Sequence, residues 1–155
     1  MRLLAILAAL VCFASQAHAN EALLGNWKLV SFYTEDTQTK QRNNAYGEHP
    51  TGAIGFTPAG RFFAFATADK RNPPKTTEDQ AAAFRTVIAY TGQWRVEGDK
   101  FITKVDVAAN PAMVGTEQVR FWNVKDGKLL ITTAPLPNPN VAGSTMVGTL
   151  VWERE

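Results

Sequence analysis

Short runs of apolar and β-branched residues, separated by tight turns, make up most of this sequence. The dipeptide Gly98-Asp99 joins residues 93–97 to residues 100–107, and Asp126-Gly127 joins the next two runs. Glycine tolerates the backbone angles of two-residue turns, and Asp-Gly between such runs is a strong hairpin signal. We therefore expect neighbouring runs to pair as antiparallel strands.

Eight runs fit this pattern. In the fifth, one face is apolar apart from a threonine, and it carries Phe101, Thr103, Val105 and Val107. The other face is charged, with Ile102 as an exception. One dry face and one wet face are typical of an antiparallel sheet. Eight such strands joined mostly by short turns favour an all-β barrel. The expected strands are residues 27–33, 52–57, 61–67, 93–97, 100–107, 116–124, 128–133 and 144–154.

Residues 77–89 have the character of a helix. Thr77 and Gln80 fit a capping box, acidic residues lie in the first turn, and three consecutive alanines follow. Each of these features favours a helix. Phe84, Val87 and Ile88 would share one of its faces. We expect one short helix between the middle strands, plugging or covering one end of the barrel.

The N-terminus has the three parts of a secretory signal peptide. Met1-Arg2 is positively charged, residues 3–13 are apolar, and Ala17-His18-Ala19 fits the small-x-small pattern of a cleavage site. The apolar run is shorter than the roughly 20 residues of a bilayer span. We expect residues 1–19 to be a signal peptide and residues 20–155 to form one periplasmic or secreted domain, with no stable membrane anchor after cleavage. An uncleaved anchor is the alternative.

Composition excludes several classes of chemistry. The net charge is +2, and the 16 basic and 14 acidic residues are interspersed. The sequence has no basic cluster, so we expect no nucleic-acid partner. After cleavage the chain would keep no cysteine and one histidine, His49. A thiol nucleophile, a disulfide and a Cys/His zinc site are then excluded. We expect no metal and no cofactor.

Five segments share an order and spacing with a known family. Gly25-Asn26-Trp27 opens the first expected strand, and residues 56–61, 88–92, 114–120 and 150–154 follow. The first segment resembles the Gly-x-Trp strand of lipocalins, and the set resembles bacterial lipocalin-like domain proteins over nearly all of residues 20–155. The chain lacks the Thr-Asp-Tyr motif of true lipocalins and a helix after the last strand. The resemblance implies a lipocalin-like barrel and leaves its ligand open.

Trp27 is expected to be structural. The resemblance implies that this tryptophan closes one end of the barrel, with an arginine over its ring in a cation–π contact. Arg154 and Arg120 are the candidates for that arginine.

Arg120 is also the candidate anchor for a ligand. It alternates with Gln118 on one face of its strand. A cation inside an apolar barrel requires a carboxylate partner or an anionic ligand. The alternatives are an outward Arg120 or a structural pair with Glu117, Glu153 or Asp106. The other candidate ligand contacts are Tyr90, Trp94, Phe101, Thr103, Val105 and Gln118.

Three functions follow from this inventory. The first is an exported barrel that binds a small apolar or amphipathic molecule in its interior. The second is a cofactor-independent isomerase, cyclase or dehydratase using Glu117, Tyr90 and Arg120, which requires a carboxylate and a donor in one pocket. The third is a filled barrel that acts through its surface. An interior cavity below about 100 Å³ would favour the third, because ligand pockets measure roughly 300 Å³ or more.

Overall fold

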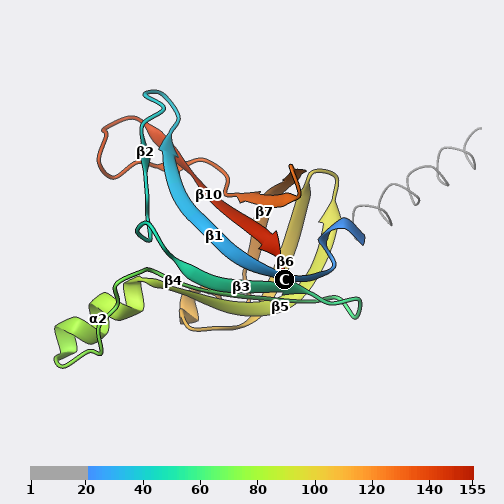
Figure 1. Ribbon diagram of the computed structural model, residues 1–155, viewed down its shortest axis with the longest axis horizontal. Coiled ribbons are helices and arrows are strands. Elements are labelled where there is room, and N and C mark those ends of the chain that lie inside the picture. The colour runs from blue at the N-terminus through green and yellow to red at the C-terminus, as the bar shows by residue number, and fades with distance from the viewer. Residues whose placement is uncertain (1–20) are drawn as a thin grey trace, which may run out of the picture.

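The first and last long strands, β1 (Gly25–Asp36) and β10 (Thr145–Arg154), pair with each other along most of their length. The computed structural model describes residues 21–155 and places ten strands in the order β2-β1-β3-β4-β5-β6-β7-β8-β10-β9. Because β1 also pairs with β10, the eight long strands close into an antiparallel barrel (Figure 1). The predicted eight-stranded barrel is confirmed. The predicted signal peptide, residues 1–19, lies outside the described residues.

The expected strands agree with the observed ones to within a few residues, apart from the fourth, which was expected at residues 93–97. That strand begins at Val87 instead of residue 93. Two short strands, β2 (Arg42–Asn43) and β9 (Leu136–Pro137), extend the edges of β1 and β10. The remaining strands are β3 (Thr51–Phe56), β4 (Arg61–Thr67), β5 (Val87–Glu97), β6 (Lys100–Ala108), β7 (Glu117–Lys125) and β8 (Lys128–Thr132).

The two ends of the barrel differ in their connections. Tight turns join β3 to β4, β5 to β6 and β7 to β8 at one end. Strand direction alternates around an antiparallel barrel, so every long connection lies at the other end. We call that end the mouth, and it is bounded by residues 37–50, 68–86, 109–116 and 133–144. Figure 1 shows β2 and α2 (Thr77–Arg85) at this end.

Residues before β1 close the end opposite the mouth. Trp27 is 1% exposed, and its Nε1 donates a hydrogen bond of 2.9 Å to the carbonyl oxygen of Leu23, which is itself fully buried. The guanidinium carbon of Arg154 lies 4.3 Å from the centroid of the Trp27 ring. The same guanidinium donates to the carbonyl oxygens of Ala22 and Leu24. Arg154, one of the two candidates, therefore holds the ring and the N-terminal segment together.

Aromatic side chains fill the barrel near this closed end. The ring centroid of Phe56 lies 4.8 Å from that of Phe62, 4.9 Å from that of Trp94 and 5.1 Å from that of Phe101. The rings meet in tilted or edge-to-face arrangements, which aromatic pairs prefer. Tight packing of these rings fills this part of the interior.

A bulge in β6 changes which residues face inward. Gly92 pairs with Val105 while Thr91 pairs with Val107, so β6 carries one extra residue at this point. A side chain at Gly92 would lie 2.0 Å from the Lys104 carbonyl oxygen, so the close approach requires glycine. Val107 was expected on the dry face but is 60% exposed. The extra residue reverses the alternation beyond it.

Helix α2 projects from the barrel and does not cover it (Figure 1). None of its residues is buried, and Phe84 is 51% exposed. The predicted plug or lid is therefore wrong. Besides α2 there is a short 3₁₀ helix, η1 (Pro111–Met113). No helix among residues 21–155 is long and apolar enough to cross a membrane.

Both ends of α2 differ from the prediction. The N-cap is Thr76, whose side chain accepts from the backbone N–H of Asp79, and Asp79 completes the capping box in place of Gln80. The helix ends at Arg85, and Val87 already pairs with Thr67 of β4. Thr86, Val87 and Ile88 are β-branched and favour a strand, so the pairing with β4 prevails over helix propensity.

Asp36 ties two connections of the mouth together. One carboxylate oxygen accepts from the backbone N–H groups of Gln38 and Thr39 at 2.9 and 2.8 Å. The other accepts from Asn138 Nδ2 at 2.6 Å and from Ser144 Oγ at 2.7 Å. The Ser144 hydroxyl, the Thr39 N–H and the Asn138 amide hold the pKa of this carboxyl far below its ordinary value of 3.8.

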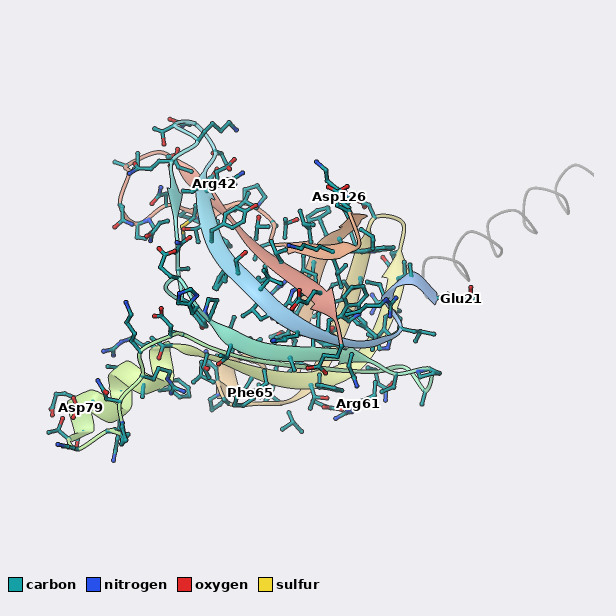
Figure 2. The ribbon with its side chains drawn as sticks, in the orientation of Figure 1. Glu21, Arg42, Arg61, Phe65, Asp79 and Asp126 are labelled. Atoms are coloured by element: carbon teal, nitrogen blue, oxygen red, sulfur yellow. The ribbon has the colours of Figure 1, made fainter. Side chains whose placement is uncertain are left out.

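We expect Trp27→Ala to lower the free energy of unfolding by about 3–5 kcal/mol, because it removes a fully buried indole and its hydrogen bond. Urea unfolding measures the change. Phe65→Ala is the matched control, because Phe65 is 56% exposed and points away from the barrel (Figure 2). A loss below about 1 kcal/mol for Trp27→Ala would contradict its structural role.

We expect Asp36→Asn to lower the thermal midpoint at pH 6 and to bring it closer to that of the wild type as the pH falls. A carboxyl with a depressed pKa stabilises the fold above its unfolded pKa of about 3.9, and this contribution is lost as pH falls toward the folded value. Thermal unfolding from pH 6 to pH 2 tests this, with Asp126→Asn in an exposed turn as the control. A gap that stays constant down to pH 2 would contradict the assignment.

Candidate functional site

The barrel interior contains a small apolar cavity of about 90 Å³. Among residues 21–155, the one charged residue in its wall is Arg120. The wall consists of Phe32, Ile54, Phe62, Ala64, Ala66, Ile88, Tyr90, Phe101, Arg120, Ile131, Thr133, Leu150 and Trp152. This volume is below about 100 Å³, so the cavity by itself favours a barrel filled by its own side chains. Taken alone, the cavity is therefore too small for a whole ligand.

A groove of about 380 Å³ at the mouth meets this cavity. The groove lies between the end of α2, the start of β5 and the η1 connection, and Phe84 and Met113 form part of its wall. Ile88, Tyr90 and Arg120 line both the groove and the cavity. The two spaces therefore adjoin at these three side chains, and the groove reaches the size of an ordinary ligand pocket.

Arg120 lies at this junction without a carboxylate partner. Its side chain is half-buried, and its guanidinium donates to the carbonyl oxygen of Val119 at 2.8 Å and to Oε1 of Gln118 at 3.0 Å. No carboxylate of residues 21–155 forms an ion pair with it. Of the acids considered as partners, Glu117 pairs with Arg95 and Asp106 pairs with Arg61. The charge of Arg120 is thus met only by neutral oxygens.

Tyr90 is the second polar residue at the junction. The side chain is 8% exposed, and its ring centroid lies 5.6 Å from that of Phe62. Burial raises the pKa of the Tyr90 phenol, and the positive charge of Arg120 offsets part of this increase. The hydroxyl therefore stays protonated at neutral pH and can donate a hydrogen bond.

The structure brings some of the predicted ligand contacts together and separates others. Arg120, Tyr90 and Phe101 form part of the cavity wall, and Gln118 forms part of the groove. Thr103 and Val105 are buried, but the cavity wall does not include them. Trp94 packs on Phe56 and donates to the Thr57 carbonyl oxygen at 3.3 Å, away from the cavity.

Several wall residues were not found from the sequence. Phe32 lies beyond a bulge in β1, between Leu29 and Ser31, which reverses the alternation of inward and outward positions. Leu150 and Trp152 come from β10, and Thr133 directly follows β8. The alternation within 144–154 was a usable signal for Leu150 and Trp152, since both share its apolar face.

The geometry does not provide the acid–base pair that the enzyme hypothesis requires. Glu117 is exposed and forms a bidentate pair with Arg95, whose guanidinium lowers the Glu117 pKa. Within the described part of the chain, neither the cavity nor the groove has a carboxylate in its wall. Among residues 21–155, no group of three or more His, Cys, Asp or Glu side chains could hold a metal ion.

A larger hollow of about 480 Å³ lies outside the barrel, between α2 and the segment before it. Its wall is mostly charged and polar and includes Asp69, Lys70, Arg71, Lys75 and Asp79. It is open to solvent and has no apolar interior, so it lacks the features of a small-molecule site. The junction at Arg120 combines an apolar interior with a few placed polar groups and is the better candidate.

Comparison with known proteins identifies the family of this chain. The model of the lipocalin-like domain family matches residues 24–155. No curated protein sequence matches this chain. A solved structure, that of EF1p2_mFAP2b bound to DFHBI, is similar with a TM-score of 0.46 at 13% sequence identity, covering 90% of this chain and 99% of that chain. Since the family match spans nearly all of the described barrel, the chain belongs to the lipocalin-like domain family.

Proposed function

We propose that this barrel binds a small amphipathic molecule at its mouth, with the apolar part in the interior cavity and an anionic group beside Arg120. One observation carries the proposal: Arg120 stands where the apolar cavity meets the groove, and it has no carboxylate partner among residues 21–155. A cation in such a place is stabilised by an anionic ligand.

The apolar wall supplies affinity for the other part of the molecule. Burying apolar surface contributes roughly 25 cal/mol per Å². The cavity of about 90 Å³ is smaller than the roughly 150 Å³ space that holds a benzene ring in an engineered protein. The cavity therefore accepts only a short apolar segment, and the rest of the ligand lies in the groove of about 380 Å³.

Export is part of the same proposal. The charged start, the apolar run and Ala17-His18-Ala19 support a cleaved signal peptide and a periplasmic or secreted protein. The absence of cysteine from residues 20–155 is compatible with an oxidising compartment.

We expect Arg120→Gln to weaken octanoate binding by about 1.5–3 kcal/mol, the value of a hydrogen bond to a charged group. Binding of 1-octanol, which has the same chain length and no charge, should change much less. The variant without ligand should keep or gain stability, because no ion pair is lost. Isothermal titration calorimetry of both probes and thermal unfolding give these values.

Arg95→Gln is the matched control, since it removes the same charge from the outer wall, where Arg95 pairs with Glu97 and Glu117. It should leave octanoate affinity unchanged. A wild type that binds neither probe would overturn the proposed function. Equal losses for the two probes in Arg120→Gln would show that Arg120 supports the fold and does not bind the anion.

We expect the full-length chain, expressed in a bacterium with a periplasm, to be recovered there beginning at Asn20. Cleavage after Ala19 removes 19 residues, which intact-mass spectrometry detects directly. Ala19→Arg should block cleavage, because the peptidase requires a small residue there. Recovery of an uncleaved wild-type chain from the cytoplasm would refute the proposed export.

A further inference from the structure

The polar groups in the cavity wall offer hydrogen-bond donors. Arg120 is a donor by its chemistry, and the Tyr90 hydroxyl makes no hydrogen bond with residues 21–155. The Thr133 hydroxyl oxygen already accepts from the backbone N–H of Gly148 at 3.0 Å. The wall residues that the structure describes include no carboxylate or amide side chain. A molecule that fits this wall must therefore supply acceptors.

The indole N–H of Trp152 is a second donor, and it lies further from the mouth than Arg120 does. Trp152 pairs with Leu29 of β1 and Leu129 of β8, both buried near the closed end. Trp152 is 2% exposed and forms part of the cavity wall. Its buried Nε1 has no acceptor among residues 21–155. A buried donor without a partner is unfavourable, and such groups are uncommon in folded proteins.

Two other buried side chains also lack a partner, and they provide a contrast. Thr103 Oγ1 and Trp122 Nε1 are both without a hydrogen bond to residues 21–155. Neither residue is part of the cavity wall. Of these three residues, Trp152 is the one that forms part of the cavity wall.

We propose that the ligand carries a second polar group, an uncharged acceptor oxygen on its inner segment, which accepts a hydrogen bond from Trp152 Nε1. This inference rests on the proposed function, because it assumes that a molecule anchored at Arg120 extends into the cavity. The ligand class is then an oxygenated short-chain acid, bearing a carbonyl, ether or hydroxyl group. A plain hydrocarbon acid would leave the indole N–H unpaired.

The test compares octanoate with oxo-octanoates that carry one ketone at successive chain positions. In the wild type, the oxo-octanoate with its ketone at one particular position should bind at least as tightly as octanoate. The ketone loses a hydrogen bond to water on binding, and the Trp152 N–H replaces it. Trp152→Phe removes the N–H and keeps an aromatic ring. It should lower the affinity of that oxo-acid relative to octanoate by about 3- to 10-fold, the range for one hydrogen bond.

Trp122→Phe is the matched control, because it removes an equally unpaired N–H outside the cavity wall. It should leave the ratio of the two affinities within about twofold. An unchanged ratio in Trp152→Phe at every ketone position would overturn the inference, as would an equal fall in Trp122→Phe. A water molecule that accepts a hydrogen bond from the Trp152 indole would leave the affinity ratio unchanged in Trp152→Phe.

A second measurement uses the wild type, in case Trp152→Phe does not fold. The indole N–H proton of Trp152 should resonate further downfield with the preferred oxo-octanoate bound than with octanoate bound. Identical resonances in the two complexes would overturn the inference. If octanoate and 1-octanol do not bind the wild type at all, the proposed function itself fails, so the two failures are distinguishable.

Discussion

The pairing of β1 with β10 determines the architecture of this protein. It turns a ten-stranded sheet into a closed barrel, in which each long strand has one inward face. The interior is then determined by strand alternation and by the points where alternation fails. Two bulges, one in β1 after Leu29 and one in β6 opposite Gly92, decide that Phe32 faces the cavity and that Val107 faces outward.

The two ends of the closed barrel differ, because all the long connections between its strands lie at the mouth. Aromatic rings and the Trp27–Arg154 contact fill the closed end, where packing alone determines which side chains fit. At the mouth the interior meets the groove, and the guanidinium of Arg120 is half-buried there. A cation is tolerated at this depth because it reaches neutral oxygens and solvent, and it remains free to bind an anion.

Turn chemistry and strand periodicity were sufficient to predict the barrel, since Gly98-Asp99 and Asp126-Gly127 define their hairpins locally. The helix was misplaced because Val87 and Ile88 fit its apolar face, while their pairing with β4 is a long-range contact that no local pattern contains. The site was predicted only in part, because it too depends on long-range packing that no local pattern contains. Strand alternation identifies inward residues such as Thr103, but it does not tell which of them are covered by packing and which border open space.

A crystal structure of this protein with octanoate bound would locate the ligand directly. We predict the carboxylate within hydrogen-bond distance of Arg120, with a short part of the chain in the cavity near Leu150 and the rest in the groove. Octanoate seated only in the hollow beside α2 or on the outer wall at Phe65, with the cavity unchanged, would contradict this prediction.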